Sequence, residues 1–275
     1  MHSFLLVNKG GSWVNTRDYG LRLLAFLPES LSSRTDYQEV SGRHGVIDNG
    51  TTFSERKISA SFSISGQDVV DYGMRVAEVY GLFATDTDIE IVNSRFPGKV
   101  WRVKVTSAFT PEMVGTSTGK FDIEFTSALP FAYSLGSSLD PRTFDADKWQ
   151  LGQGLLPADD VAYSFSTTKF KIYNAGDVTI DPAQDMPLLI TYKGASSGLK
   201  LTNKTTKNTV SFSGTTNAAD TMKFKELRIL KNDSSVFSQT NRKYISLAPG
   251  WNDFELSGTS GTFTISFDFH FFYRG

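Results

Sequence analysis

Apolar and polar residues alternate with a period of two along much of the chain, which is the pattern of β-strands that bury one face. The clearest case in the first half is residues 57–65, where polar residues, mostly serines, occupy the opposite face. Its apolar positions are Ile58, Ala60, Phe62 and Ile64. This segment is therefore predicted to be a strand with one face in a hydrophobic core.

Two further segments, one containing Arg102 and Lys104 and one containing Asp122 and Glu124, alternate aromatic or aliphatic residues with charged ones. We expect a hairpin in which Lys104 lies across from Asp122 and Arg102 across from Glu124. Such cross-strand pairs contribute about 0.2–1 kcal/mol each, so the apolar face supplies most of the stability. Asp122 and Glu124 also resemble the carboxylate pair of a glycoside hydrolase, but the facing cations favour a solvated charge ladder.

One segment of the first half has the three- and four-residue spacing of an amphipathic helix. The apolar positions with this spacing are Val69, Tyr72, Val76, Val79 and Phe83. Ser65 and Asp68 are read as a variant of the capping box, in which Ser65 accepts a hydrogen bond from the N–H of Asp68. Gly73 and Gly81 each weaken an isolated helix by about 1 kcal/mol. We therefore expect a helix that is held by packing on a sheet and does not bind a cofactor.

A Gly/Ser-rich tract at residues 134–138, followed by Asp140 and Pro141, indicates a boundary between two domains. We expect an N-terminal domain at residues 1–135 and a C-terminal domain at residues 136–275. After the boundary only strand patterns occur, at residues 169–173, 187–193, 199–203, 209–213, 222–230, 243–247, 251–256 and 262–272. Regularly spaced short strands of this kind favour an antiparallel β-sandwich.

The last of these segments alternates over its whole length. Its expected inward residues are Phe263, Ile265, Phe267, Phe269 and Phe271. A strand this apolar would aggregate at an exposed sheet edge, so we place it in the centre of the C-terminal domain. The chain as a whole is expected to be mainly β, with one helix in its first half.

The composition is that of an ordinary soluble globular protein, with 275 residues, 39% hydrophobic residues and a net charge of −1. Sequence-specific nucleic-acid binding is not expected. Such binding rests on neutralising several phosphates at once, and the basic residues of this chain are not concentrated enough to do so. Membrane insertion is not expected either, since the apolar runs are far shorter than the roughly 18 residues of a membrane span, and the first residues lack the features of a secretion signal. The absence of cysteine excludes disulfides, thiolate metal sites and cysteine nucleophiles, and it fits synthesis in a reducing cytoplasm.

We find no constellation of residues with the spacing of a catalytic or metal site. His270 and Asp268 share one strand face, which resembles a base with its orienting carboxylate, but no serine in a nucleophile context accompanies them. Three histidines and no cysteine make a zinc site atypical, and no glycine-rich phosphate loop is present. We therefore expect no enzyme activity, no cofactor and no metal.

Exposed aromatic residues on a β-sandwich raise an alternative, which is a sugar-binding module. Pyranose rings stack on aromatic side chains, while neighbouring amides and carboxylates bind the hydroxyl groups. Trp251, Asn252 and Asp253, with Tyr192, are the candidate carbohydrate contacts. The competing interpretation, which we favour, is that Trp251 packs in the core after the turn at residues 249–250.

Several segments, taken together, resemble the distal tail protein family of phages that infect Gram-positive bacteria. They are residues 41–48 (SGRHGVID), 129–134 (LPFAYS), 173–177 (YNAGD) with 187–191 (PLLIT), and 247–252 (LAPGWN). The first resembles the family's glycine–arginine–x–glycine–x–leucine–aspartate stretch, and the last resembles its proline–glycine–x–asparagine turn. Ile47 stands where leucine is usual and Ser41 where proline is frequent. By the order and spacing of these segments, the resemblance extends over nearly the whole chain.

This resemblance implies an N-terminal β-sandwich or split barrel with one α-helix and a β-hairpin, then a C-terminal galectin-like antiparallel β-sandwich. It implies a structural hub at the distal end of the phage tail, a homohexameric ring that forms alone or as two stacked rings. The implied neighbours are the tail tube protein and the tail-tip lysin or receptor-binding protein. The alternative function is a carbohydrate-binding module that contributes to attachment to the host cell wall.

The segment at residues 41–50 is rich in glycine and polar residues, so we expect an extended loop or hairpin outside the packed core. Each subunit of a cyclic ring offers two different patches to its neighbours, and an arm that reaches the next subunit enlarges that contact. Arg43 is suited to bind a neighbouring carboxylate through two hydrogen bonds. The predicted interface residues are Gly42, Arg43, His44, Gly45 and Asp48. The competing interpretation is a surface loop without a partner.

Overall fold

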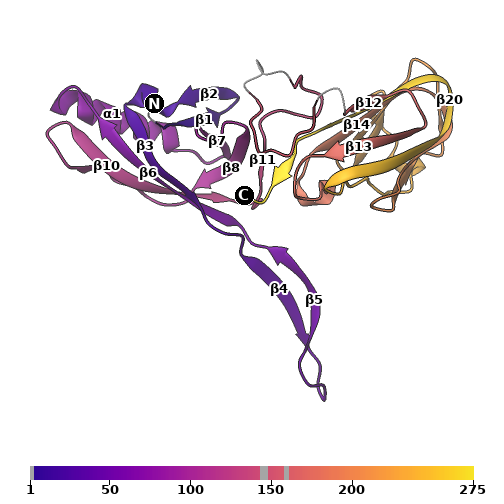
Figure 1. Cartoon of the computed structure of the whole chain (residues 1–275), viewed down its shortest axis with the longest axis horizontal. Helices are drawn as coiled ribbons and strands as arrows, with labels where there is room; N and C mark the ends of the chain where they lie inside the picture. The colour runs from indigo at the N-terminus through magenta and orange to yellow at the C-terminus, as the bar shows by residue number, and fades with distance from the viewer. Residues whose placement is uncertain (1–2, 143–147, 158–160) are drawn as a thin grey trace. The chain divides into compact units, whose positions relative to one another are not determined.

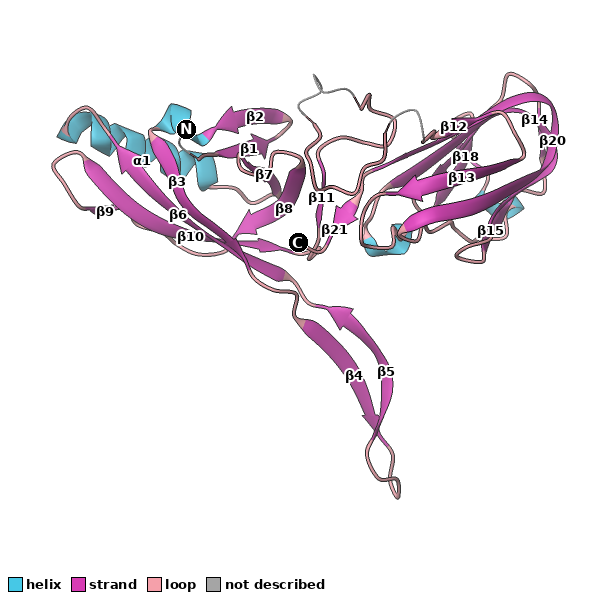
Figure 2. Ribbon diagram, in the orientation of Figure 1, coloured by secondary structure: helices cyan, strands magenta, loops and turns pink. Residues whose placement is uncertain are grey.

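The computed structural model describes residues 3–142, 148–157 and 161–275, and it divides into two compact units (Figure 1). The N-terminal unit comprises Met1–Ala132 with Arg274–Gly275, and the C-terminal unit comprises Tyr133–Tyr273. Both consist mainly of antiparallel strands, and the described residues contain one α-helix (Figure 2). The expected mainly β fold is therefore confirmed. No helix in the described part of the chain has the length and hydropathy that crossing a membrane requires.

The N-terminal unit is built on an antiparallel sheet with the strand order β2-β1-β7-β8-β10-β6-β3. The strands are β1 (Leu5–Lys9), β2 (Ser12–Asn15), β3 (Leu21–Pro28), β6 (Arg56–Ser65), β7 (Ile89–Asn93), β8 (Lys99–Val105) and β10 (Thr118–Ser127), and short β9 (Glu112–Met113) pairs with β10. A 3-10 helix (Thr16–Tyr19) joins β2 to β3. Within the described residues the sheet does not close into a barrel, because β2 and β3 stand at the two ends of this order.

The alternation predicted for residues 57–65 is confirmed in β6, whose four apolar residues are all buried. Phe62 is the centre of the core of the N-terminal unit. Its ring stacks on Phe121 of β10 at a centroid distance of 5.4 Å and lies 6.1 Å from the ring of Phe83. The helix α1 (Val69–Phe83) thus covers the buried face of β6 and β10.

The start of α1 differs from the prediction. Asp68 is the N-cap residue, and its Oδ1 accepts a hydrogen bond from the N–H of Asp71 at 2.8 Å. Asp71 Oδ2 in turn accepts from the N–H of Gln67 at 2.7 Å, which, with the side chain of Arg75, lowers the pKa of Asp71. Ser65 belongs to β6, so the expected cap at Ser65 is wrong. Val69 is the first residue of the helix and is exposed, whereas the other four residues of the predicted stripe are at least partly buried.

The strands β8 and β10 are neighbours, but their register is not the expected one. Lys104 lies opposite Thr126, four residues from the expected Asp122, so both predicted charge pairs are wrong. The reason is that β10 pairs with β6 along its whole length, and only its end pairs with β8. Because four is an even number, the buried and exposed faces of both strands are nevertheless those predicted.

The charged residues of this sheet have other partners. Lys57 Nζ lies 3.1 Å from Glu124 Oε1, and this hydrogen bond raises the pKa of Lys57. Arg102 and Lys104, which were expected to pair with carboxylates of β10, lie near Asp88 instead. Its oxygens are 3.9 Å from Arg102 Nε and 3.7 Å from Lys104 Nζ. These exposed pairs contribute little to stability, so they do not set the register.

A separate two-stranded ribbon is inserted between β3 and β6. It consists of β4 (Ser33–Glu39) and β5 (Val46–Phe53), which we call the arm (Figure 1). Main-chain hydrogen bonds from Ser54 to Ser32 and from Glu29 to Lys57 carry the pairing of β3 and β6 into the arm. The chain therefore leaves the sheet and returns to it as one continuous hairpin.

The C-terminal unit is an antiparallel β-structure with the main strand order β12-β20-β14-β17-β18-β19. The strands are β11 (Ala132–Ser134) at the unit boundary, β12 (Ser164–Phe165), β13 (Lys169–Asn174), β14 (Leu188–Asn203), β15 (Asn208–Ser211), β16 (Thr215–Thr216), β17 (Thr221–Lys225), β18 (Arg228–Lys231), β19 (Ser234–Ser235), β20 (Gly250–Phe269) and β21 (Phe272–Tyr273). Two short 3-10 helices lie at Pro182–Gln184 and Phe237–Gln239. The strand β20 pairs with β12, β13 and β14, so the central position expected for the last apolar segment is confirmed.

Several predicted strands of this unit have different bounds. Residues 187–193 and 199–203 belong to one strand, β14, which continues through register shifts after Gly194 and Ser196. Likewise β20 contains residues 251–256 and most of 262–272. The predicted strand at 222–230 is the hairpin β17–β18, and residues 243–247 form only an isolated bridge through Leu247. Glycine and serine marked strand ends in the sequence, but in β14 they mark bulges, where the ladder bends and goes on.

Candidate oligomer interface

The five predicted interface residues all lie toward the free end of the arm. Gly42, Arg43, His44 and Gly45 form the turn between β4 and β5, and Asp48 lies in β5 opposite Tyr37. All five are exposed. Gly42 and Gly45 have φ angles of 82° and 78°, which side chains other than glycine rarely adopt. The turn therefore depends on both glycines.

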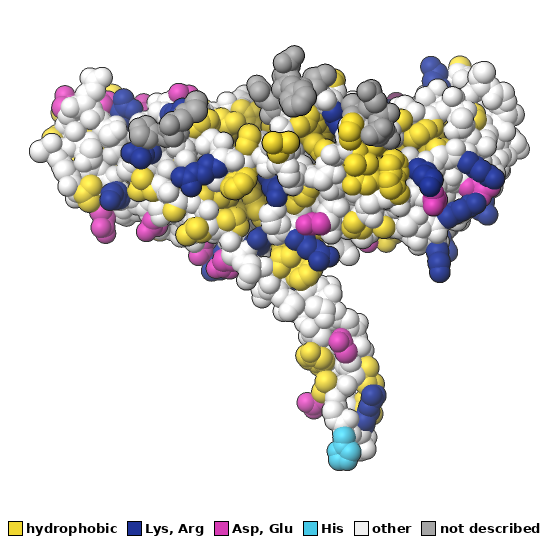
Figure 3. Space-filling view, viewed as in Figure 1, with side chains coloured by type: hydrophobic (Ala, Val, Ile, Leu, Met, Phe, Trp, Pro, Cys, Tyr) yellow, Lys and Arg dark blue, Asp and Glu magenta, His cyan; other side chains and the backbone are white. Residues whose placement is uncertain are grey.

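The arm has no hydrophobic core of its own. Every residue of β4 and β5 is exposed or half-buried, and the exposed apolar side chains include Tyr37, Val46 and Phe53. Figure 3 shows apolar and charged side chains interspersed along it. A two-stranded ribbon of this kind is at best marginally stable in water by itself. Its form is that of a segment that gains stability by packing on another surface.

The base of the arm, in contrast, is firmly held by Arg56 at the start of β6. This side chain is buried, and burial lowers its pKa. Its guanidinium donates to the carbonyl oxygens of Glu29 (2.6 Å), Pro130 (3.3 Å) and Arg274, and it lies 4.9 Å from the ring centre of Trp101. Sequence reasoning missed Arg56, because its partners are main-chain carbonyls far away in the sequence.

The four candidate sugar contacts in the C-terminal unit are not brought together. Tyr192 is fully buried and its hydroxyl bonds to the carbonyl of Ala195 and to Thr259. Asn252 is also fully buried, whereas Trp251 and Asp253 point to the opposite, exposed side of β20. Trp251 therefore lies on the surface and not in the core position that we favoured. The two exposed residues remain the only pair of the four that a sugar can reach in this structure.

Asn252 has a structural task in the turn before β20. Its Oδ1 accepts from the N–H of Ala248 (2.9 Å) and from Asn203 Nδ2 (3.0 Å), and its Nδ2 donates to the carbonyls of Ala248 (2.7 Å) and Gly250 (3.1 Å). These bonds, made by a buried side chain, hold the 249–250 turn, in which Pro249 is exposed and Gly250 half-buried. The amide thus closes the turn and is not free to bind a ligand.

We predict that Asn252→Ala lowers the free energy of unfolding of the C-terminal unit by about 2–4 kcal/mol, because each buried polar group left unpaired costs about 1–3 kcal/mol. The matched control is Asp253→Ala, which removes only an exposed ion pair with Lys171 and should cost less than about 1 kcal/mol. Chemical denaturation followed by circular dichroism measures both. Equal losses in the two variants would contradict the structural role of Asn252.

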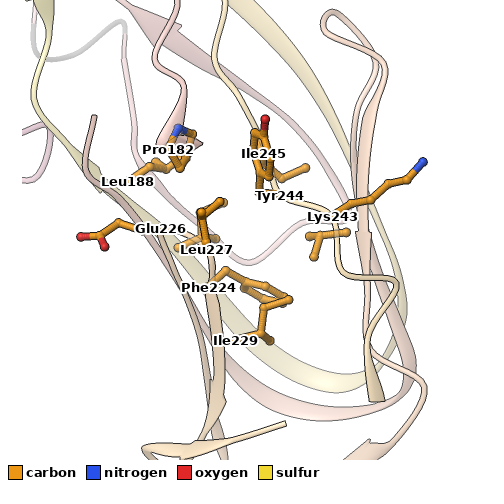
Figure 4. A pocket seen from close by; sticks show the side chains of 11 residues that line it. Pro182, Leu188, Phe224, Glu226, Leu227, Ile229, Lys243, Tyr244 and Ile245 are labelled. Carbon is orange, nitrogen blue, oxygen red and sulfur yellow. The ribbon is translucent and has the colours of Figure 1, made fainter. Parts of the chain in front are cut away.

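His270, the candidate catalytic base, lies against the main chain. His270 Nδ1 lies 2.7 Å from the carbonyl oxygen of Ser134, and its ring contacts Tyr133. Within the described ranges, no three His, Asp or Glu side chains are grouped so that they could hold a metal ion. A cavity in the C-terminal unit (Figure 4), lined by Pro182, Phe224 and Tyr244 among others, has a volume of about 20 Å³, which is the size of one water molecule.

Part of the chain matches a family of phage tail proteins, and its fold matches that of a solved structure. Residues 14–127 match the family model of the phage tail protein RIFT-related domain. The crystal structure of the Dit protein of phage SPP1, described as a paradigm of the hub adsorption apparatus in phages that infect Gram-positive bacteria, has the same fold, with a TM-score of 0.69 and 14% identity over 97% of this chain and 99% of that one. A chain of the phage P2 baseplate in its activated conformation with Ca aligns with a TM-score of 0.48 and 10% identity over 98% of both chains. No curated protein matches the chain.

Proposed function

We propose, because residues 14–127 match the family model of the phage tail protein RIFT-related domain, that this chain is the structural hub of a phage tail tip. This match supports the resemblance to phage tail proteins that the motif at residues 41–48 indicated. In the proposed role the N-terminal units assemble into a hexameric ring. The ring joins the tail tube to the tail-tip and receptor-binding proteins, at the distal end of the virion, after synthesis in the cytoplasm of the host.

The observation that carries this proposal is the arm. It is a hairpin of 21 residues from Ser33 to Phe53, with no buried residue in either strand, and it is anchored at its base by a buried arginine. An anchored arm without a core gains stability only when its apolar side chains meet another surface. A second copy of the chain can supply that surface, and head-to-tail contacts between copies form a ring when the rotation from one copy to the next closes. The number six comes from the family resemblance.

Mass measurement and electron microscopy of the purified full chain test the proposal. We expect a particle of six protomers of 30.4 kDa, or of twelve if two rings stack, with a central opening. Multi-angle light scattering gives the mass, and negative-stain images give the symmetry. A chain that stays monomeric from micromolar to high micromolar concentration would contradict the proposed ring.

A second candidate function, carbohydrate binding by the C-terminal unit, rests on one observation. The exposed ring of Trp251 lies 5.1 Å from the ring of Tyr173, beside the Lys171–Asp253 ion pair. An aromatic pair with charged neighbours is a surface on which a sugar can stack. A glycan array probed with the full chain tests it, with Trp251→Ala as the control. We expect weak or no binding, and a saturable signal lost in the variant would establish this function.

A further inference from the structure

The helix α1 has a second, largely exposed apolar face, on which Phe109 contacts the ring of Tyr80 and Lys9 Nζ donates to the carbonyl of Gly81. With about 100° of rotation per residue, its uncharged exposed residues fall on one side of the helix, opposite the residues that pack on the sheet. These residues, which we call the outer face of α1, are Val69, Val70, Gly73, Met74, Ala77, Tyr80 and Gly81. Val70 is 71% exposed and Met74 62% exposed. A surface helix normally turns charged residues to water, so an uncharged outer face indicates a contact surface.

The apolar surface continues beyond the helix. Met113 and Val114, at the end of β9, are 52% and 62% exposed. The turn that follows them is attached to the segment before α1, because the N–H of Gly66 donates to the carbonyl of Ser117 at 2.9 Å. Two separate elements of the N-terminal unit therefore contribute exposed apolar side chains.

The two helix glycines give independent support. Gly73 and Gly81 lie in regular helix without a positive φ, and a Cβ atom placed on either would meet no atom within 4 Å. Glycine weakens a helix relative to alanine, yet no described residue lies close enough to require its small size at these positions. Close approach of another chain would require it.

The arm and the outer face of α1 lie at different ends of the N-terminal unit. The arm enters β6 at Arg56, and α1 follows the other end of β6 at Ser65. Ten residues of strand separate the two ends by about 30 Å, so the arm and the outer face of α1 lie at opposite ends of the same strand. Two unpartnered surfaces at opposite ends of one protomer fit each other in a head-to-tail series of copies.

We propose that the arm of one copy packs on the outer face of α1 of the next copy, with the arm face that carries Tyr37 and Val46 against the helix. Register places these two residues on the same face of the arm, because Tyr37 pairs with Asp48 and Val46 pairs with Glu39. The inference rests on the proposed ring and names the surface that receives the arm.

The charges agree with this contact. The turn of the arm carries Arg43, and Glu78 borders the outer face of α1. Both are exposed, and neither forms an ion pair with another described residue. In the proposed contact the guanidinium of Arg43 approaches the carboxylate of Glu78 of the next copy. Lys9, whose Nζ donates to the carbonyl of Gly81 at 3.2 Å, is a positive charge at the C-terminal end of the outer face, and the arm face with Tyr37 and Val46 also carries the negative charges of Glu39 and Asp48.

The test uses the absence of cysteine in the chain. The double variant Val46→Cys and Ala77→Cys is assembled as the full chain, oxidised and run on a denaturing gel without reductant. We expect a ladder of covalent species that extends to six protomers, because each disulfide joins one copy to the next. The control pairs Val46→Cys with Asp86→Cys, an exposed residue outside the outer face, and should give no ladder.

A second variant tests the same surface without a cross-link. Gly81→Leu should leave the melting temperature of the monomer unchanged or higher and should abolish ring formation, whereas Asp86→Leu should leave the ring intact. If the unmodified chain forms rings but the cysteine variant yields no ladder and Gly81→Leu still assembles, the helix contact is refuted and the ring proposal stands. If the unmodified chain forms no ring, the proposed function fails first. A disulfide within one copy would also overturn the contact.

Discussion

A chain in which residues 33–53 are replaced by a short Gly-Ser turn is expected to remain folded and to be monomeric at concentrations where the unmodified chain forms rings. The N-terminal unit should keep its stability, because no residue of the arm belongs to its main hydrophobic core. The main-chain bond from Ser54 to Ser32, at 3.0 Å, lets a short turn close the hairpin of β3 and β6 without the arm. The loss of assembly should be complete, because every contact between neighbouring protomers in the proposed ring includes one arm.

Light scattering measures the mass of this variant, and circular dichroism measures its melting temperature. Two point variants narrow the contact to the turn. Arg43→Ala removes the charge, and Gly45→Val places a branched side chain at a φ of 78°, which distorts the turn. Rings of normal mass from the armless chain would show that the arm is not the contact, and normal rings from both point variants would exclude its turn.

The second large effect is expected in the core of the N-terminal unit. Phe62→Ala should lower the free energy of unfolding of this unit by about 3–5 kcal/mol, the usual cost of replacing a buried phenylalanine by alanine. Phe62 is completely buried and joins the two sides of the core, because its ring contacts Phe121 of the sheet and Phe83 of the helix. A cavity at this position removes support from α1, so the ring should be lost as well.

Tryptophan fluorescence measures this unfolding separately from that of the C-terminal unit. Trp13 and Trp101 lie in the N-terminal unit, so a background in which Trp149 and Trp251 are replaced by phenylalanine reports on that unit alone. The matched control is Ser59→Ala, an exposed residue on the same strand, which should change the stability by less than about 0.5 kcal/mol. A loss for Phe62→Ala no larger than that of the control would contradict the assigned core.

The predicted faces of the strands agree well with the structure. In β6 and β10 the predicted apolar positions are the buried ones, and β20 lies at the centre of its sheet as its phenylalanines indicated. The reason is that alternation follows from the local geometry of the extended backbone. The face of a residue therefore needs no knowledge of the neighbouring strand.

Register and boundaries were predicted less well, because they depend on segments that meet only in the fold. Charge complementarity suggested Lys104 opposite Asp122, but the pairing of β10 with β6 overrides a contribution that exposed ion pairs keep small. The cap of α1 was placed three residues too early, since Ser65 continues the ladder of β6. In β14, glycine at position 194 permits a bulge where a break was expected.

The sequence by itself determined the mainly β architecture, the buried face of each long strand, the single helix and an extended, glycine-dependent segment around Arg43. These follow from periodicity and from backbone preferences, which act over a few residues. Only the tertiary structure decided that this segment is the tip of an arm anchored by Arg56, and that most of the outer face of α1 is left exposed. Both depend on which main-chain carbonyls and side chains approach across the fold, and local patterns carry no information about such distant contacts.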